Sequence, residues 1–202
     1  VAEPQVAPAS NEWAKQMKKM RVPDGFKIDL FAAEPLLANP VAFTFDEHGA
    51  AYVAETYRLR TSTLDIRHYM FMLEDDLACR TTDDPIAMIK KSFPNDWQKL
   101  GIETEVVRRV VDTDGDGRAD KSSVYADGMN SLQDGTNSGV LAREGKVWCT
   151  NIPDLLLFSG LTKDGKAEKR ELLSTGYGVR FSFTGHDLHG LIRGPDGRLY
   201  FS

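Results

Sequence analysis

Residues 43–53 read Phe-Thr-Phe-Asp-Glu-His-Gly-Ala-Ala-Tyr-Val: apolar residues alternate, the chain turns at a glycine, and the alternation resumes. An aromatic residue stands three places after the glycine. The same frame returns at residues 140–149 and 191–201. Two alternating runs joined by a short polar turn with glycine are typical of a β-hairpin. The sequence therefore predicts three similar hairpins.

The spacing of these hairpins predicts a repeated unit. Their turn glycines stand at positions 49, 145 and 197, so the intervals are 96 and 52 residues. About fifty residues is the length of one propeller blade of four short strands. We therefore expect an all-β fold, with about three blades of a six- or seven-bladed β-propeller. The longer first interval is interpreted as one blade plus an insertion.

Residues 58–100 are predicted to form that insertion and to be helical. Apolar residues fall there at helical spacing, namely Ile66, Tyr69, Met70, Leu73 and Leu77. Asp84 is placed to cap a second helix with Pro85 at its first position, and a further turn is expected around Trp97. Insertions of this size tend to border a functional face, and a purely structural cover is an equal alternative.

The two ends of the chain differ from this pattern. Residues 1–21 are expected to be a linker with a short helix from Asn11 to Met20, and residues 22–202 to be the N-terminal part of the propeller domain. Residues 199–202 read as the middle of a strand. The exposed edge of an incomplete blade can pair with strands of other molecules. We therefore expect the remaining blades to come from further sequence or from another chain.

Composition excludes some classes of function. Acidic residues number 30 against 25 basic ones, so the net charge is −5 and the basic footprint of a nucleic-acid-binding protein is missing. Apolar runs are far shorter than the roughly 20 residues of a membrane span, so none is expected. Residues 1–4 fit the start left by signal-peptide cleavage, although an arbitrary start looks the same; a periplasmic or extracellular location is expected.

The most specific motif is the run Asp-Thr-Asp-Gly-Asp-Gly-Arg-Ala-Asp at 112–120. Oxygen ligands at alternate positions and glycines at the turn match the first nine places of an EF-hand calcium loop. Ser123 stands where that loop has a bidentate Glu, and strands rather than helices are expected on both sides. We expect a calcium ion that rigidifies the turn, with side-chain ligands Asp112, Asp114, Asp116 and Asp120, and the carbonyl of Arg118. The alternative is a solvated Asp/Gly turn.

The second motif is Gly-His-Asp-Leu-His-Gly at 185–190. A neutral imidazole can accept a proton from an alcohol during oxidation. We therefore expect His186 to act as the base, with Asp187 or His189 orienting its ring. The alternative is a pair of histidines that only serve the turn and the surface. Arg58 is expected to pair with the acidic insertion rather than with a ligand.

Two resemblances bear on the function. His186 followed by Gly-Pro-Asp-Gly-Arg-Leu-Tyr at 194–200 resembles the general-base segment of soluble quinoprotein sugar dehydrogenases. These are six-bladed propellers that use pyrroloquinoline quinone (PQQ) and calcium. Gly185 stands where that family has an acidic residue, and His189 where small residues are usual.

The second resemblance is to large secreted bacterial proteins described as membrane-bound dehydrogenases. It rests on residues 23–26, 40–43, 112–120 and 185–190, and covers about residues 22–202. In that group the propeller is often followed by helical repeats and a c-type cytochrome domain. The resemblance implies an oxidoreductase that dehydrogenates a sugar or other alcohol, with PQQ or haem c as acceptor and a cytochrome as electron-transfer partner.

A function from another class also fits the sequence. A non-catalytic propeller that binds carbohydrate or a partner protein would need no cofactor residues, and the chain shows no recognisable ones. The two cysteines, Cys79 and Cys149, match no metal or redox spacing, and either one disulfide or two buried thiols is expected.

Overall fold

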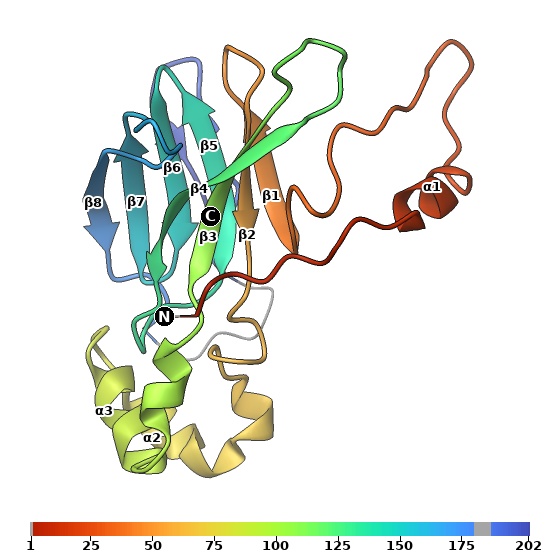
Figure 1. Cartoon of the computed structure of the whole chain (residues 1–202). Helices are drawn as coiled ribbons and strands as arrows, with labels where there is room; N and C mark the ends of the chain where they lie inside the picture. Colours follow the sequence, from red (N-terminus) through yellow and green to blue (C-terminus); the bar gives the residue numbers. More distant parts are fainter. Residues whose placement is uncertain (1, 180–186) are drawn as a thin grey trace.

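The computed structural model describes residues 2–179 and 187–202 and contains two four-stranded antiparallel sheets (Figure 1). In each sheet the strands are neighbours in the order in which they follow along the chain. The first sheet consists of β1 (Pro40–Phe45), β2 (Ala51–Glu55), β3 (Glu105–Val111) and β4 (Lys121–Met129). The second consists of β5 (Asn137–Arg143), β6 (Lys146–Asn151), β7 (Asp154–Ser159) and β8 (Lys169–Thr175).

The three predicted hairpins are confirmed. They are β1–β2, β5–β6 and a two-stranded ladder of β9 (Ile192–Arg193) and β10 (Leu199–Tyr200). The all-β expectation holds at this level. The third copy of the repeat is represented by that ladder alone, so the described residues contain two complete sheets and no closed ring of sheets.

The two complete sheets pack face to face around the main hydrophobic core. β5 lies against β1 and β2, as Figure 1 shows. The core takes Tyr52, Val107 and Tyr125 from the first sheet and Leu156 and Phe158 from the second. The rings of Tyr52 and Tyr125 meet edge to face with centroids 5.0 Å apart. Burying each such side chain contributes about 1.5–3 kcal/mol, so this interface dominates the stability of the fold.

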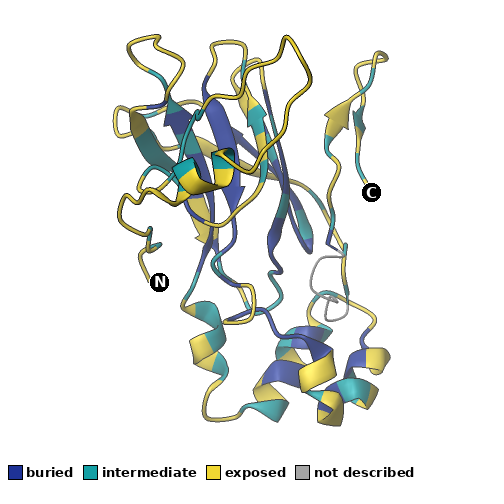
Figure 2. Cartoon of the chain, turned by 90° about the vertical axis from the view of Figure 1, so that its right-hand side faces the viewer, coloured by how far each residue is buried: buried dark blue, intermediate teal, exposed yellow. Residues whose placement is uncertain are grey.

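The outer face of the first sheet is partly covered by the N-terminal segment. Phe31, Leu36 and Leu37 pack on buried residues of β2 and β3. The predicted N-terminal helix is present as α1 (Glu12–Met17), which is shorter than expected and buries none of its residues. Figure 2 shows buried residues in the strands of the two sheets and in the helical insertion, whereas the β9–β10 ladder stands beside the sheets and is largely exposed.

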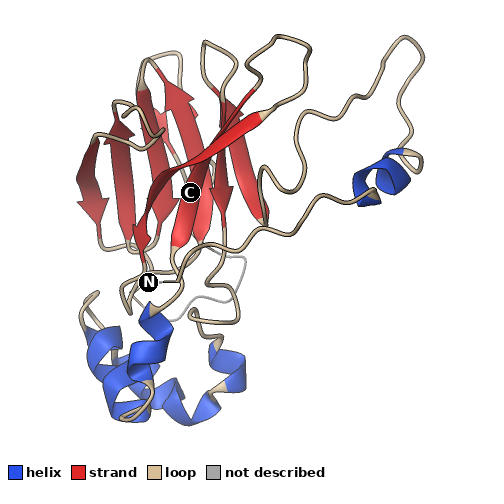
Figure 3. Ribbon diagram, in the orientation of Figure 1, coloured by secondary structure: helices blue, strands red, loops and turns tan. Residues whose placement is uncertain are grey.

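The helical insertion is confirmed and lies between β2 and β3. Figure 3 shows its helices together at one end of the sheets. They have their own small core of Ile66, Met72, Cys79 and Met88. The elements are the 3-10 helices η1 (Ile66–His68), η2 (Met70–Met72) and η3 (Trp97–Gly101) and the α-helices α2 (Leu73–Ala78) and α3 (Asp84–Ser92).

Two details of the helix prediction were wrong. Met70 and Leu77 are exposed, because the predicted single helix is broken into three short ones and the apolar face is lost. Asp84 is the first residue of α3 rather than its cap. Its carboxylate accepts hydrogen bonds from the backbone N–H groups of Arg80 and Thr81, which precede the helix.

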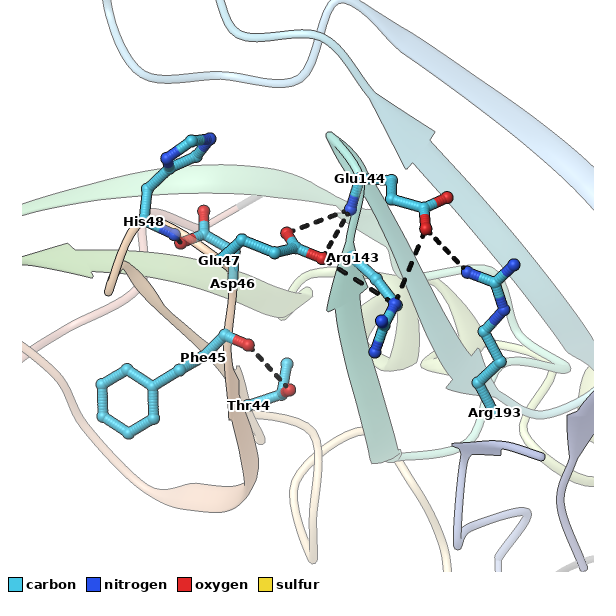
Figure 4. A network of polar contacts seen from close by, with 8 residues as sticks. All are labelled: Thr44, Phe45, Asp46, Glu47, His48, Arg143, Glu144 and Arg193. Atoms are coloured by element: carbon cyan, nitrogen blue, oxygen red, sulfur yellow. Dashed lines mark hydrogen bonds and ion pairs between the residues drawn. The ribbon is translucent and has the colours of Figure 1, made fainter. Parts of the chain in front are cut away.

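The three hairpins are joined by a chain of polar contacts (Figure 4). The carboxylate of Glu47, in the first turn, accepts the backbone N–H of Glu144, in the second, at 3.1 and 3.2 Å. Arg143 lies 3.8 Å from Glu47, and Arg193 of β9 donates to Glu144 at 3.0 Å. These groups are exposed, so the contacts add little stability. They place the first turn, the second turn and the last residue of β9 next to one another in chain order.

The two cysteines are buried in separate hydrophobic clusters and form no disulfide. Of the two alternatives, the structure therefore has two buried thiols. Burial raises the pKa of the Cys149 thiol to about 12. Such a thiol is inert at neutral pH.

Candidate functional site

A buried polar cluster lies at the end of the sheets that faces the helical insertion. We call it the polar junction; it comprises Glu55, Arg58, Glu105, Arg108 and Asn137. Glu55 is the last residue of β2, Glu105 the first of β3 and Asn137 the first of β5. All three are buried, and both carboxyl groups are fully so. Buried charges persist only where they are paired and hydrogen-bonded, so their partners decide what this cluster can do.

Glu55 forms a buried ion pair with Arg108. The Nε of Arg108 donates to Oε1 of Glu55 at 2.6 Å. The same carboxylate accepts the N–H of Ala38 at 2.8 Å and the hydroxyl of Tyr57 at 2.9 Å. Burial, together with the charge of Glu55, raises the pKa of Tyr57 to about 12. Glu55 thus fastens the N-terminal segment and the first residues of the insertion to β3.

Glu105 connects the insertion to the second sheet. Its Oε1 accepts hydrogen bonds from the hydroxyl of Thr56 and the N–H groups of Tyr57 and Arg58, at 3.0, 2.9 and 2.7 Å. Its Oε2 accepts the N–H of Asn137 at 2.7 Å. Burial raises the pKa of Glu105, and this outweighs the opposite effect of the four donors. The carboxyl group is held on every side and has a structural role.

Arg58 does not pair with the acidic insertion, and that expectation was wrong. Its side chain is fully buried and donates to the backbone carbonyls of Glu103, Ser131 and Asp134 at 3.0, 3.0 and 3.1 Å. Desolvation lowers the pKa of this arginine. Because both terminal nitrogens donate to carbonyl groups of the chain, Arg58 ties the connection from β4 to β5 to the insertion, whereas its buried Nε has no hydrogen-bond partner among the described residues.

The predicted catalytic segment reaches the polar junction through Asp187. His186 lies outside the described residues. Asp187 is 6% exposed, and one of its oxygens accepts the hydroxyl of Thr136, the neighbour of Asn137. The other oxygen, Oδ1, is buried and has no hydrogen-bond partner among the residues that the structure describes. An unpaired buried carboxylate oxygen is costly, so this group is a candidate for a functional role.

His189 is not part of that arrangement. Its side chain is exposed, and its Nδ1 lies 3.3 Å from the hydroxyl of Ser202. The backbones of His189 and Ser202 also exchange hydrogen bonds at 2.9 and 3.0 Å. The structure therefore brings Asp187 to the polar junction and directs the ring of His189 to the end of the β9–β10 ladder.

The predicted calcium loop joins β3 to β4, as expected. Ligand atoms of Asp112, Asp114 and Asp116 lie within 4.8 Å of one another. Asp112 accepts the N–H groups of Gly115 and Gly117 at 2.7 and 2.8 Å, and these bonds hold the pKa of Asp112 below its usual value. Both glycines have positive φ, +80° and +89°, which only glycine adopts without strain.

Asp120 stands apart from the three clustered aspartates. Its oxygens accept the hydroxyl of Thr113 at 2.8 and 2.9 Å. Arg118, whose carbonyl is the remaining expected ligand, stacks its guanidinium on Trp13 at 5.1 Å. Three carboxylates drawn together in one exposed turn fit a calcium ion, whereas the fourth predicted side chain already has another partner.

The two candidate sites lie at opposite ends of the sheets. β3 begins at Glu105 in the polar junction and ends at Val111, just before the calcium loop. In Figure 1 the loop between β3 and β4 is at the end of the sheets away from the insertion helices α2 and α3. The loop and Asp187 are therefore separated by the length of the sheets.

Sequence reasoning missed Glu55, Glu105, Arg108 and Asn137. A signal was present, because Arg108 and Arg109 interrupt an otherwise apolar strand sequence. A charge inside such a run is either exposed or paired across the sheet, and Glu55, the partner of Arg108, is 53 residues away. That distance is what hid the pair.

None of the helices among the described residues is long and apolar enough to cross a membrane. No curated protein and no solved structure matches the chain. The family described as a domain of unknown function, DUF7133, matches residues 12–202. The match covers nearly the whole chain, which therefore belongs to the DUF7133 family.

Proposed function

We propose that the chain forms the first blades of a β-propeller in a periplasmic or extracellular oxidoreductase that dehydrogenates a sugar or other alcohol. The propeller interpretation is supported by two antiparallel sheets of identical strand order and the start of a third. The contacts between Glu47, Glu144 and Arg193 support it as well, because they join the corresponding ends of successive hairpins.

The observation that carries the proposed reaction is the state of Asp187. This carboxylate is almost fully buried, has one oxygen without a hydrogen-bond partner among the described residues, and directly follows His186 in the sequence. In the proposed step His186 accepts the hydroxyl proton of the alcohol while hydride leaves to the electron acceptor. A buried carboxylate next to the histidine stabilises the imidazolium that forms. The helical insertion borders this end of the sheets and can limit access to it.

A bound quinone or haem would supply the acceptor for the hydride or the electrons. PQQ carries three carboxylates, which call for free cationic groups. Arg58 is fully buried and donates to carbonyls through both terminal nitrogens, so its remaining Nε is out of reach of a ligand, and Arg108 donates to Glu55. The described residues at the polar junction therefore do not fit PQQ, and in this proposal the quinone or haem acceptor and any cytochrome partner are held by other parts of the protein.

We also propose that the 112–120 loop binds calcium through Asp112, Asp114, Asp116 and the carbonyl of Arg118. The clustering of the three carboxylates supports this assignment. The ion would neutralise their mutual repulsion and fix the turn between β3 and β4.

A second candidate is a non-catalytic propeller that binds carbohydrate or a partner protein. It is favoured by the polar junction itself, where Glu55 and Glu105 are held by internal donors. A junction that only fastens the insertion to the sheets needs no catalytic group.

A dye-linked dehydrogenase assay on the intact protein separates the two candidates. It uses a panel of sugars and alcohols, with and without added PQQ. We expect oxidation of at least one substrate, loss of activity in His186→Ala, and a fall in kcat of roughly a hundredfold or more in Asp187→Asn. His48→Ala, at an exposed turn of the far end, is the matched control and retains activity. Undiminished activity of His186→Ala refutes the assigned base; absence of oxidation under every condition leaves the binding function.

A further inference from the structure

The outer face of the first sheet carries large exposed apolar side chains. Phe43 is 66% and Phe45 46% exposed, although both belong to strand β1. The ring of Phe45 contacts those of Phe43 and Phe31. Contiguous exposed apolar surface of this kind marks an interaction site.

The repeat identifies the positions of the second sheet that are equivalent to Phe43 and Phe45. Aligned on the turn glycines, Ala51 and Val53 of β2 correspond to Val147 and Cys149 of β6. In the first sheet Phe45 and Phe43 of β1 pair with Ala51 and Val53. In the second sheet Ala142 and Val140 of β5 pair with Val147 and Cys149. Phe43 and Phe45 thus occupy the places of Val140 and Ala142.

In the second sheet the residues at these positions are buried. Val140 is 6% and Ala142 5% exposed, because they pack on the first sheet. Phe158 of β7, which pairs with Val147, is buried in the same interface. The second sheet therefore has one face that the preceding sheet covers, and the equivalent face of the first sheet includes Phe43 and Phe45.

The N-terminal segment covers this face incompletely. It packs over Ala51, Val53 and Val110 but leaves an open groove of about 410 Å³ that includes Phe43 and Phe45. Among the described residues that line the groove, Asp29 is the only charged one. An apolar groove of this size against a sheet leaves packing contacts unused, as an incomplete interface does.

We infer that the outer face of the first sheet, at Phe43 and Phe45, binds a further four-stranded antiparallel sheet of the same polypeptide. In the interface between the two sheets, the face of one sheet is covered by the neighbouring repeat of the same chain. A second copy is disfavoured, since it would have to present the far face of its second sheet. That face is in contact with the next repeat: a Cβ at Gly139 would lie 3.6 Å from His189 and 3.7 Å from Leu191.

The inference rests on the repeat and not on the proposed reaction, so its test uses no activity. Phe43→Cys and Phe71→Cys are introduced separately into the full-length protein, and maleimide labelling rates are measured under native conditions. Phe71, in the insertion, is 70% exposed and is the size-matched control. The parent protein, with its two buried thiols, gives the background.

We expect Phe43→Cys to be labelled roughly tenfold or more slowly than Phe71→Cys, because a covered thiol reacts only when the interface opens. The difference should not depend on protein concentration. Equal rates would show an open face and overturn the inference. Protection that vanishes on dilution would assign the face to a second copy and overturn it as well. If Phe43→Cys melts differently from the parent, Phe45→Cys gives the same readout at the neighbouring position.

Discussion

Calcium binding by the 112–120 loop can be tested through its effect on thermal unfolding. The structure gathers three carboxylates, Asp112, Asp114 and Asp116, and leaves Asp120 with Thr113. Sites of this kind outside the cytoplasm bind calcium with a Kd of roughly 10⁻⁴–10⁻³ M. At about 10 mM calcium, such a Kd raises the Tm of a protein of this size by roughly 3–10 °C.

Two variants that remove the same charge distinguish a metal site from general screening. In Asp114→Asn one of the three clustered ligands is lost, while the amide oxygen can still accept the N–H of Asp116. We expect the calcium-dependent rise in Tm to fall by more than half. In Asp120→Asn the amide oxygen can still accept from Thr113, and the cluster is intact. We expect this variant to keep the full rise.

The assay is a melt followed by circular dichroism at constant ionic strength, with chelator, with calcium and with magnesium. Magnesium should have a smaller effect, because it demands a tighter octahedral site than an exposed turn provides. Two results would refute the reasoning. One is a Tm of the parent protein that does not respond to calcium. The other is an equal loss of the response in both variants, which would indicate only a reduced negative charge.

Three further predictions concern stability and reactivity. Glu55→Gln removes one partner of a buried ion pair and should lower the free energy of unfolding by about 3–5 kcal/mol, measured in urea; a loss under about 1 kcal/mol would contradict it. Burial raises the pKa of Asp134 from 3.8 to about 6, so the folded state binds the proton more tightly and stability should fall by up to about 3 kcal/mol as pH rises from about 4 to about 6. Asp134→Asn should lack this fall, and an unchanged pH profile would refute the assignment. Cys149, with its raised pKa and full burial, should react with maleimide only on global unfolding, and fast labelling of the native protein would show otherwise.

The features that the sequence predicted correctly are local ones. A turn glycine, alternating neighbours and an aromatic residue three places on define a hairpin within about ten residues. All three such hairpins are present. The helical character of the insertion was also local information. Its internal breaks were not, because the burial of Met72 and exposure of Met70 depend on packing against α3.

The polar junction could not be predicted because it is assembled from distant parts of the chain. Arg58 and the Asp134 carbonyl are 76 residues apart, and Thr136 and Asp187 are 51 apart. The pairing of β2 with β3 spans the whole insertion and carries no turn signal. In the calcium loop composition indicated four equivalent aspartates, and only the backbone geometry shows that Asp120 turns to Thr113.

The insertion leaves and rejoins the first sheet at adjacent points, since Glu55 and Val106 are paired across β2 and β3. The segment between them is a loop that starts and finishes at the same end of the sheet, so its length has little effect on the pairing of β2 with β3. Doubling such a loop costs only about 0.6 kcal/mol of closure entropy. Evolution can therefore lengthen, shorten or exchange the segment between Arg60 and Ile102 while the strands keep their register. Within the family, we expect the length of the chain to vary most at this end of the molecule, while the sheets stay the same.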